Sequence, residues 1–260
     1  MHCNPSGMNK DNTMKINTEK IGSSLRFFFM AVLFLALCCQ TAAYAQNTTA
    51  DSKKSPGLAS PLKVDLMFVL DNSGSMIRND PQFITRQAVI DYLKNIRNDF
   101  RIGMVLFYKD ARLVEPLTAV TTSELKAKIL NKLGQINYKG QFTNTPAGVE
   151  RAIYELKDSG REDARKVIVL LTDGIVDTGN KDQDLEGEKW LKEDLAMECK
   201  KAGIRIFGVA FTDNADFRLL QSLAIQTDGE YFRAYTTADI QTVFNKVDRI
   251  IVTPVETVKE

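Results

Sequence analysis

The sequence is poor in the side chains that most nucleophilic and zinc sites require. Its 260 residues include one histidine, His2, and four cysteines, three of which also lie within the first 45 residues. Beyond residue 45 the chain keeps a single cysteine, Cys199, and no histidine. That part cannot form a Ser-His-Asp or Cys-His nucleophile, a histidine-ligated or multi-cysteine zinc site, or an intrachain disulfide. Cys199 falls on an apolar helical stripe and is predicted to be a small buried hydrophobe.

The chain also lacks an excess of charge of either sign. Lysine and arginine total 34 and aspartate and glutamate total 33; without residues 1–45 the totals are 30 and 31. A protein without a basic excess has no electrostatic footprint for nucleic acid or an anionic membrane, so neither is expected as a partner. The sequence has no G-x-G-x-x-G and no Walker lysine loop, which argues against nucleotide binding.

The N-terminal segment has the pattern of an export signal. Arg26 precedes thirteen apolar residues, Phe27 to Cys39, and Ala43-Tyr44-Ala45 offers a small-x-small cleavage site. We therefore expect residues 1–45 to be a signal peptide cut after Ala45 and the protein to be exported, either secreted or periplasmic. An uncleaved membrane anchor is the alternative, but it needs about 20 apolar residues, and Gln40 interrupts the run. No membrane span is expected in the mature chain.

Composition divides the rest of the chain into three parts. Residues 46–62 are polar and rich in Thr, Ser and Lys, which predicts a flexible linker. A domain follows over 63–253, and 254–260 form a C-terminal tail. The 215 residues after the signal are enough to bury an apolar core without disulfides. Met1 and Met14 are both open as the true start.

The domain alternates predicted strands and helices. Near-continuous apolar runs, typical of parallel strands covered on both faces, occupy Val64–Leu70, Arg101–Tyr108, Val167–Leu171 and Ile204–Phe211. Ala111–Thr118 contains Pro116, which marks an antiparallel edge strand, and a short sixth strand lies near Glu230–Ala234. The pattern predicts an α/β fold: a doubly wound, mostly parallel six-stranded sheet with one antiparallel edge strand and helices on both faces, as in Rossmann-like folds.

Capping signals place the helices. Asp80-Pro81 should open the first, and the capping box Thr121–Glu124 the second. Further helices are expected from Pro146, near Glu186, from Asp216 and from Ala238. The basic residues Arg151, Lys157, Arg161 and Arg165 are expected to form the solvated side of one of these helices.

Oxygen-bearing side chains follow the first predicted strand. In Asp71-Asn72-Ser73-Gly74-Ser75, alternate positions can turn the Asp71 carboxylate and the Ser73 and Ser75 hydroxyls toward one cation. Hard oxygen donors select magnesium, manganese or calcium. The same residue types also form ordinary turns, so an ordinary turn is the competing interpretation.

Two later segments strengthen the metal interpretation. Gly140-Gln141-Phe142-Thr143-Asn144-Thr145-Pro146 brings hydroxyls to the start of a helix, where either threonine could reach an ion. Val167 to Gly174 is another buried strand that ends in a carboxylate, Asp173. Ligand crevices in such sheets lie beyond the carboxyl ends of strands, where Asp71 and Asp173 both fall.

Together these segments resemble the metal-ion-dependent adhesion site (MIDAS) of von Willebrand factor type A (VWA) domains, written D-x-S-x-S, then a threonine, then T-D-G. The resemblance covers about Lys63 to Val252. It implies a metal set of Asp71, Ser73, Ser75, Thr143 and Asp173, with Thr145 as the second choice for the threonine. It also implies Mg²⁺, with Mn²⁺ or Ca²⁺ as alternatives, and capture of an Asp or Glu carboxylate from a partner protein. Family members often place two glycines directly before the threonine, whereas Gln141 and Phe142 stand there in this chain.

Residues beside the metal segments are candidates for a partner-binding rim, expected to be exposed as a group: Met76, Ile77, Arg78, Phe142, Ile175 and Val176. A run of acidic residues suggests either a second cation site or a solvated helix face: Asp177, Asp182, Asp184, Glu186 and Glu188.

Two other functions compete with a non-enzymatic binding module. The first is a magnesium-dependent hydrolase with Asp71 as nucleophile or base. Against it, the sequence has no D-x-D nucleophile pair and no lysine beside a phosphate loop, and the mature chain has no histidine acid. The second is a structural domain with no functional metal site.

Overall fold

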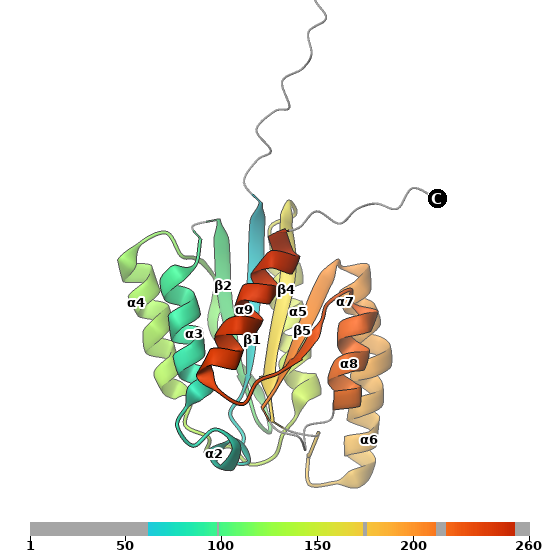
Figure 1. Cartoon of the computed structure of the whole chain (residues 1–260). Coiled ribbons are helices and arrows are strands. Elements are labelled where there is room, and N and C mark those ends of the chain that lie inside the picture. The colour runs from blue at the N-terminus through green and yellow to red at the C-terminus, as the bar shows by residue number, and fades with distance from the viewer. Residues whose placement is uncertain (1–61, 98, 174–175, 212–216, 253–260) are drawn as a thin grey trace, which may run out of the picture. The chain divides into compact units, whose positions relative to one another are not determined.

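The computed structural model describes residues 62–97, 99–173, 176–211 and 217–252. The predicted signal peptide, nearly all of the linker and the tail lie outside these ranges. The described residues build a sheet with helices on both faces; α3 (Ile84–Asn95) and α9 (Thr237–Val252) lie in front of it in Figure 1, and α5 (Thr145–Asp158) lies behind it. None of the helices in this part of the chain has the length and apolar character needed to cross a membrane.

The sheet has the predicted strands and topology. Its order is β3-β2-β1-β4-β5-β6, and β3 is antiparallel to β2 while the other pairs are parallel. Pro116 lies in the edge strand β3, where its missing N–H breaks no central ladder. The strands are β1 (Lys63–Asp71), β2 (Phe100–Phe107), β3 (Ala111–Ala119), β4 (Ala164–Thr172), β5 (Ile204–Ala210) and β6 (Tyr231–Arg233).

Each face of the sheet carries its own hydrophobic core. Along β1, Phe68 and Leu70 point into one core while Met67 and Val69 point into the other, so the strand is buried on both sides. The first core is covered by α2 (Met76–Asn79), α3, α4 (Ser123–Lys132) with the 3₁₀ turn Leu133–Gln135, and α9. The second is covered by α5, the π-helical segment Leu191–Leu195 that joins α6 (Lys181–Trp190) to α7 (Ala196–Lys201), and α8 (Phe217–Gln226).

The start of the first long helix differs from the prediction. α3 begins at Ile84 rather than at Pro81, and the short α2 that precedes it was not predicted. Phe83 adopts a left-handed backbone with φ of 54°, which breaks the helical path, and its ring stacks on Tyr138 at 4.8 Å. Asp80 still caps the helix, because its carboxylate accepts hydrogen bonds from the backbone N–H groups of Ile84 and Thr85.

The predicted basic side of α5 is also partly wrong. Arg161 lies just beyond the helix and, with Arg101, binds the buried carboxylate of Asp65 on β1. Cys199 is buried as predicted; burial, followed by the neighbouring charge of Glu198, raises the pKa of its thiol to about 12, so it is unreactive.

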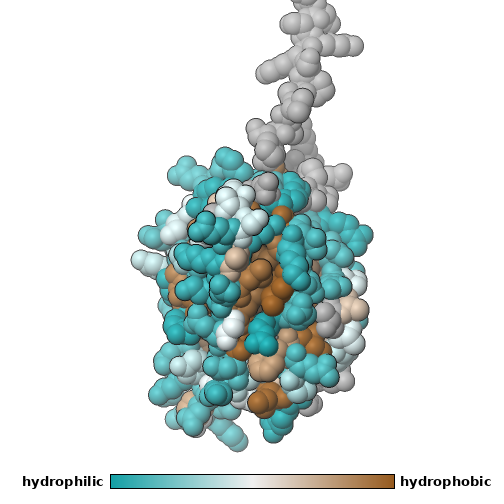
Figure 2. Space-filling view, turned by 90° about the vertical axis from the view of Figure 1, so that its left-hand side faces the viewer, coloured by the Kyte–Doolittle hydropathy of each residue, from teal (hydrophilic) through white to brown (hydrophobic). Residues whose placement is uncertain are grey.

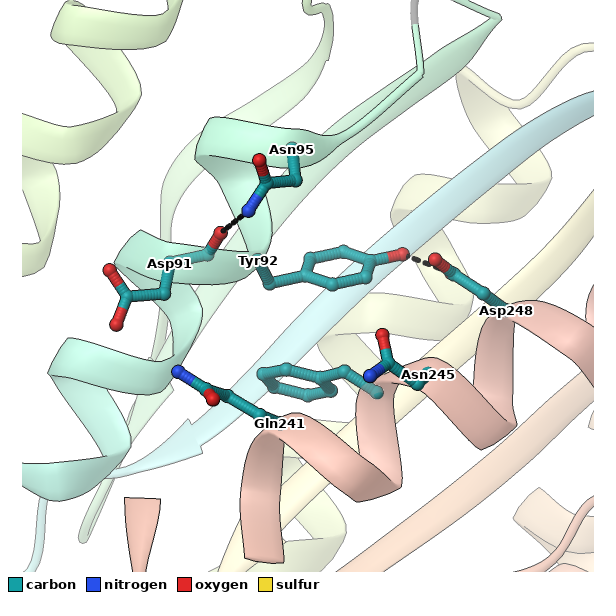
Figure 3. Close-up of a pocket in the computed structure, with 7 residues that line it drawn as sticks. Asp91, Tyr92, Asn95, Gln241, Asn245 and Asp248 are labelled. Carbon is teal, nitrogen blue, oxygen red and sulfur yellow. Dashed lines mark hydrogen bonds between the residues drawn. The ribbon is translucent and has the colours of Figure 1, made fainter. Parts of the chain in front are cut away.

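Helix α9 is attached to α3 at the outer surface of the first core. The Tyr92 hydroxyl on α3 donates to Asp248 on α9 at 2.6 Å, and the rings of Tyr92 and Phe244 lie 4.9 Å apart (Figure 3). A surface cavity of about 310 Å³ lies between the two helices. Its lining residues come from the middle and end of each helix and include none of the predicted metal ligands.

Candidate metal centre

The two aspartates of the predicted site lie at the ends of neighbouring strands. Asp71 is the last residue of β1 and Asp173 follows β4; the two strands are parallel, with Leu70 paired to Leu171. Both aspartates are buried, with 0% and 4% of their surface exposed. The fold therefore brings together two carboxylates that are 102 positions apart in the sequence.

The two serines connect these carboxylates. The hydroxyls of Ser73 and Ser75 lie 2.9 Å apart, and the Ser75 hydroxyl donates to Asp173 Oδ1 at 3.1 Å. The Ser73 backbone N–H donates to Asp71 Oδ1 at 2.8 Å, which closes the turn after β1. Four of the five predicted ligands thus form one continuous polar cluster.

Two residues that sequence reasoning missed hold the carboxylates in place. The Thr172 hydroxyl donates to Asp71 Oδ2 at 2.6 Å, and the Asn79 amide at the end of α2 donates to Asp173 Oδ2 at 2.5 Å. Thr172 stands directly before Asp173, so the T-D pair supplied a signal for it. No sequence signal pointed to Asn79, because α2 was not predicted.

Electrostatics in the cluster favour a bound cation. Burial first, and then the negative charge of Asp173, raise the pKa of Asp71 to about 6, although hydrogen bonds from Ser73 and Thr172 act to lower it. A buried carboxylate near a second carboxylate is unfavourable unless a positive charge balances them. The donors that converge are carboxylate and hydroxyl oxygens, the hard ligands that suit Mg²⁺, Mn²⁺ or Ca²⁺. The residues present therefore fit a divalent cation.

Asn72 fixes the loop on the other side of the site. Its Oδ1 accepts hydrogen bonds from the backbone N–H groups of Asn137 and Tyr138, both at 2.8 Å. The Gly140 N–H donates to the Asn72 carbonyl at 3.1 Å, and the Gly74 N–H donates to the Gly140 carbonyl at 2.8 Å. These four bonds attach the segment that leads to Thr143 to the turn that carries Ser73.

Both candidate threonines are buried next to this loop. Thr143 exchanges two backbone hydrogen bonds with Asp177, of 2.6 and 3.0 Å, which tie it to the segment after Asp173. Thr145 is the first residue of α5, and its hydroxyl has no hydrogen-bond partner among the described residues. Asn144 between them caps α5 by accepting from the Ala147 N–H at 3.2 Å.

The predicted rim needs two corrections. Met76 and Val176 have 0% and 3% of their surface exposed because each packs into one of the hydrophobic cores, so neither can contact a partner. Ile77, 52% exposed, Arg78 and Phe142 do reach the surface. Ile175 lies outside the described residues.

Phe142 occupies a strained position at this rim. Its backbone φ is 68°, and its ring lies so close to Gly179 that a Cβ there would approach Phe142 Cε1 to 2.5 Å. The ring packs against Gly179 in the loop before α6 and keeps an exposed edge.

The acidic run after Asp173 shapes the start of α6. Asp184 accepts hydrogen bonds from the Thr178 backbone N–H and hydroxyl, at 2.6 and 2.7 Å, and Asn180 caps the helix. Within the described ranges, no group of three or more acidic, histidine or cysteine side chains is arranged to hold a metal. The alternative of a second cation site in this run is therefore not supported.

Comparison with known proteins identifies the family of this domain. A family model for the von Willebrand factor type A domain matches residues 65–246, and the chain belongs to this family. Over 197 residues it is 29% identical to the collagen alpha-1(VI) chain of Mus musculus, covering 68% of this chain and 18% of that one. The chain spans about a fifth of the length of such mammalian relatives.

Solved structures share the fold. The von Willebrand factor type A protein from Catenulispora acidiphila matches with a TM-score of 0.62 and 16% identity, over 75% of this chain and 44% of that one. Proximal thread matrix protein 1 from the mussel byssus, with a zinc-occupied MIDAS motif, matches with a TM-score of 0.55 and 17% identity, over 73% and 48%. VWA domains are usually non-enzymatic protein-binding modules, and a MIDAS in this family typically binds a divalent cation.

Proposed function

We propose that this protein captures an Asp or Glu carboxylate of a partner protein through a divalent cation held by Asp71, Ser73, Ser75, Thr143 and Asp173. The observation that carries the proposal is the convergence of Asp71, Ser73, Ser75 and Asp173 in one hydrogen-bonded cluster at the carboxyl ends of β1 and β4. Mg²⁺ is the proposed ion, with Mn²⁺ or Ca²⁺ as alternatives.

Different residues of the chain have different roles at such a site. Ser73 and Ser75 are neutral donors and add no negative charge beside the ion, while Thr172 and Asn79 keep the two aspartates from turning away. When bound, the ion supplies an open coordination position that an incoming carboxylate can occupy. Ile77, Arg78 and Phe142, exposed around the cluster, add contact area to that interaction.

A binding module explains the site better than the hydrolase alternative does. Asp71 is fully buried, and each of its oxygens already accepts a hydrogen bond, from Ser73 and from Thr172. A carboxylate in that state is poorly placed to attack a substrate. The described residues contain no histidine that could act as a general acid. We therefore propose that the protein is not an enzyme.

We also propose that the protein acts outside the cytoplasm after cleavage behind Ala45. The apolar run from Phe27 to Cys39 and the Ala-Tyr-Ala site support this proposal. N-terminal sequencing of the exported protein should begin at Gln46. A product that retains residues 27–39 and stays in the membrane fraction would instead favour an uncleaved anchor.

Affinity capture from the producing cells tests the function. The protein and its Ser73→Ala variant are immobilised in Mg²⁺ or in EDTA, and the retained proteins are identified. The proposal predicts a partner that is retained only by the unchanged protein and only in Mg²⁺, and that is lost when a single Asp or Glu of the partner is replaced. Equal retention in EDTA, or by Ser73→Ala, would contradict metal-dependent capture.

A further inference from the structure

A groove of about 540 Å³ adjoins the metal-site turn. Its walls are the turn after β2, from Tyr108 to Asp110, the start of β3 at Arg112, and the loop that contains Lys139 and Gly140. All of these segments meet at the end of the domain where α2 lies, the lower end in Figure 1. Figure 2 shows the side of the domain that carries α4, where hydrophilic side chains predominate toward that end.

The groove is continuous with the metal cluster. Asn72, which lines it, stands between Asp71 and Ser73 in the chain. Gly140, on the opposite wall, bonds to the backbone of Asn72 and Gly74 at 3.1 and 2.8 Å. An extended peptide advances about 3.3 Å per residue, so a peptide with one carboxylate at the metal reaches the groove within a few residues.

The groove carries a local positive charge in an otherwise balanced protein. Lys109, Arg112 and Lys139 are exposed around it, and Asp110 is its one acidic lining residue, which leaves two net positive charges. Within the part of the chain that the structure describes, neither lysine forms an ion pair, and Arg112 donates to the neutral Gln135 side chain at 2.8 Å. These cations are available to an acidic ligand.

The shape of the groove is fixed by close packing and a hydrogen bond. A Cβ on Gly140 would lie 2.3 Å from Tyr108 Cβ, so the Tyr108 side chain rests directly on the glycine backbone. The Tyr108 N–H also donates to the Asp110 carbonyl at 3.2 Å, which closes the turn. A ligand that binds a fixed surface loses less free energy to ordering.

We infer that this groove binds a second acidic residue of the same partner segment that presents its carboxylate to the metal. The inference rests on the proposed function and specifies its ligand: a peptide segment with an Asp or Glu for the cation and further acidic residues a few positions away for Lys109, Arg112 and Lys139. Complementary charge at the edge of an interface chiefly sets partner choice and association rate. The groove therefore determines which carboxylate-bearing partners are accepted.

Two labelled peptides test the inference by fluorescence anisotropy. Both have a Gly-Ser background with one central Asp, and only the second adds three Glu residues from two to five positions away. In Mg²⁺ the protein should bind the acidic peptide about a hundredfold more tightly. Lys109→Gln/Lys139→Gln should lower that preference about tenfold, since exposed charge pairs contribute modestly each. Lys126→Gln/Lys201→Gln, with the same charge change on surfaces away from the groove, should keep the preference.

Different outcomes separate the two proposals. If the peptides bind only in Mg²⁺ but the groove variant keeps the full preference, the inference is overturned while the proposed function stands. If the binding of neither peptide depends on Mg²⁺ or on Asp71, both the inference and the proposed function are contradicted. An oligothymidylate that binds more tightly than the acidic peptide, without Mg²⁺ and through Lys109 and Lys139, would make the groove a general polyanion site and overturn the inference.

Discussion

Replacing Gly140 with alanine should disturb the metal-site turn, because the added methyl group has no room beside Tyr108 and Asn72. An added Cβ would lie 2.3 Å from Tyr108 Cβ and 2.9 Å from the Asn72 carbonyl oxygen, distances that van der Waals radii do not permit. Neither neighbour is the free end of a flexible side chain, so the loop itself must shift. The Gly140 backbone also makes the two bonds to Asn72 and Gly74 that hold that turn.

The magnitude follows from the cost of overpacking and weakened bonds. Inserting a methyl group into a close-packed contact costs about 1–3 kcal/mol, and a weakened backbone hydrogen bond about 1 kcal/mol. We expect the free energy of unfolding to fall by about 2–3 kcal/mol. A domain of this size loses about 2–4 °C of midpoint per kcal/mol, so the thermal midpoint should fall by about 4–12 °C. Cation affinity should fall with it, because Ser73 and Ser75 stand on the displaced turn.

Gly134→Ala is the matched control. A Cβ there meets no atom within 4 Å, so this variant should keep the stability of the parent or gain about 0.4–1 kcal/mol from the unfolded state. Urea and thermal unfolding followed by circular dichroism measure both variants. If Gly140→Ala proves as stable as Gly134→Ala and binds the cation equally well, the attachment of the two loops through Gly140 is refuted.

Further predictions concern the cluster and the opposite end of the sheet. Thr172→Val removes the hydroxyl that donates to Asp71 and should weaken cation affinity in calorimetry by about tenfold to a hundredfold; unchanged affinity would contradict its orienting role. Thr143→Val should abolish cation binding while Thr145→Val preserves it, and the reverse result would identify Thr145 as the ligand. Asp65→Asn should lower the unfolding free energy by about 3 kcal/mol at neutral pH, because it leaves Arg101 and Arg161 without their counterion. Burial acts to raise the pKa of Asp65, but the hydrogen bonds from the two arginines outweigh it and hold that pKa below 3.8. The stabilisation by the Asp65 carboxylate is therefore present above pH 3.8 and is lost on further acidification. The parent protein should show this loss, and Asp65→Asn should not.

Much of the fold could be predicted because its strands are buried on both faces. Near-continuous apolar runs such as Val64–Leu70 identified the central strands, and Pro116 identified the edge. The errors in the predicted fold concern single elements, such as the start of the first helix. The first helix begins three residues beyond Pro81 because Phe83 takes a left-handed backbone to stack on Tyr138, a residue 55 positions away. No local propensity encodes such a contact.

At the candidate site, too, local sequence patterns could be predicted and long-range contacts could not. Spacing alone aligned Ser73 and Ser75 with Asp71, and strand ends placed Asp173 beside them. The roles of Asn72, Asn79 and the Gly140 loop depend on hydrogen bonds between distant segments, so they could not be assigned from local sequence patterns. Met76 was misplaced because a residue next to a polar turn can still point into the core when a helix begins there.

Thermal unfolding in EDTA and in titrated Mg²⁺, Mn²⁺ and Ca²⁺ tests most directly whether the cluster around Asp71 holds a divalent cation. A ligand that binds only the folded state adds about 2.7 kcal/mol at one hundred times its dissociation constant. The protein should show a cation-dependent rise in the midpoint of about 5–11 °C. Asp71→Asn, which keeps the shape but removes the charge, should show none. If no cation changes the thermal midpoint of the protein, or if Asp71→Asn shows the same rise, the account is contradicted.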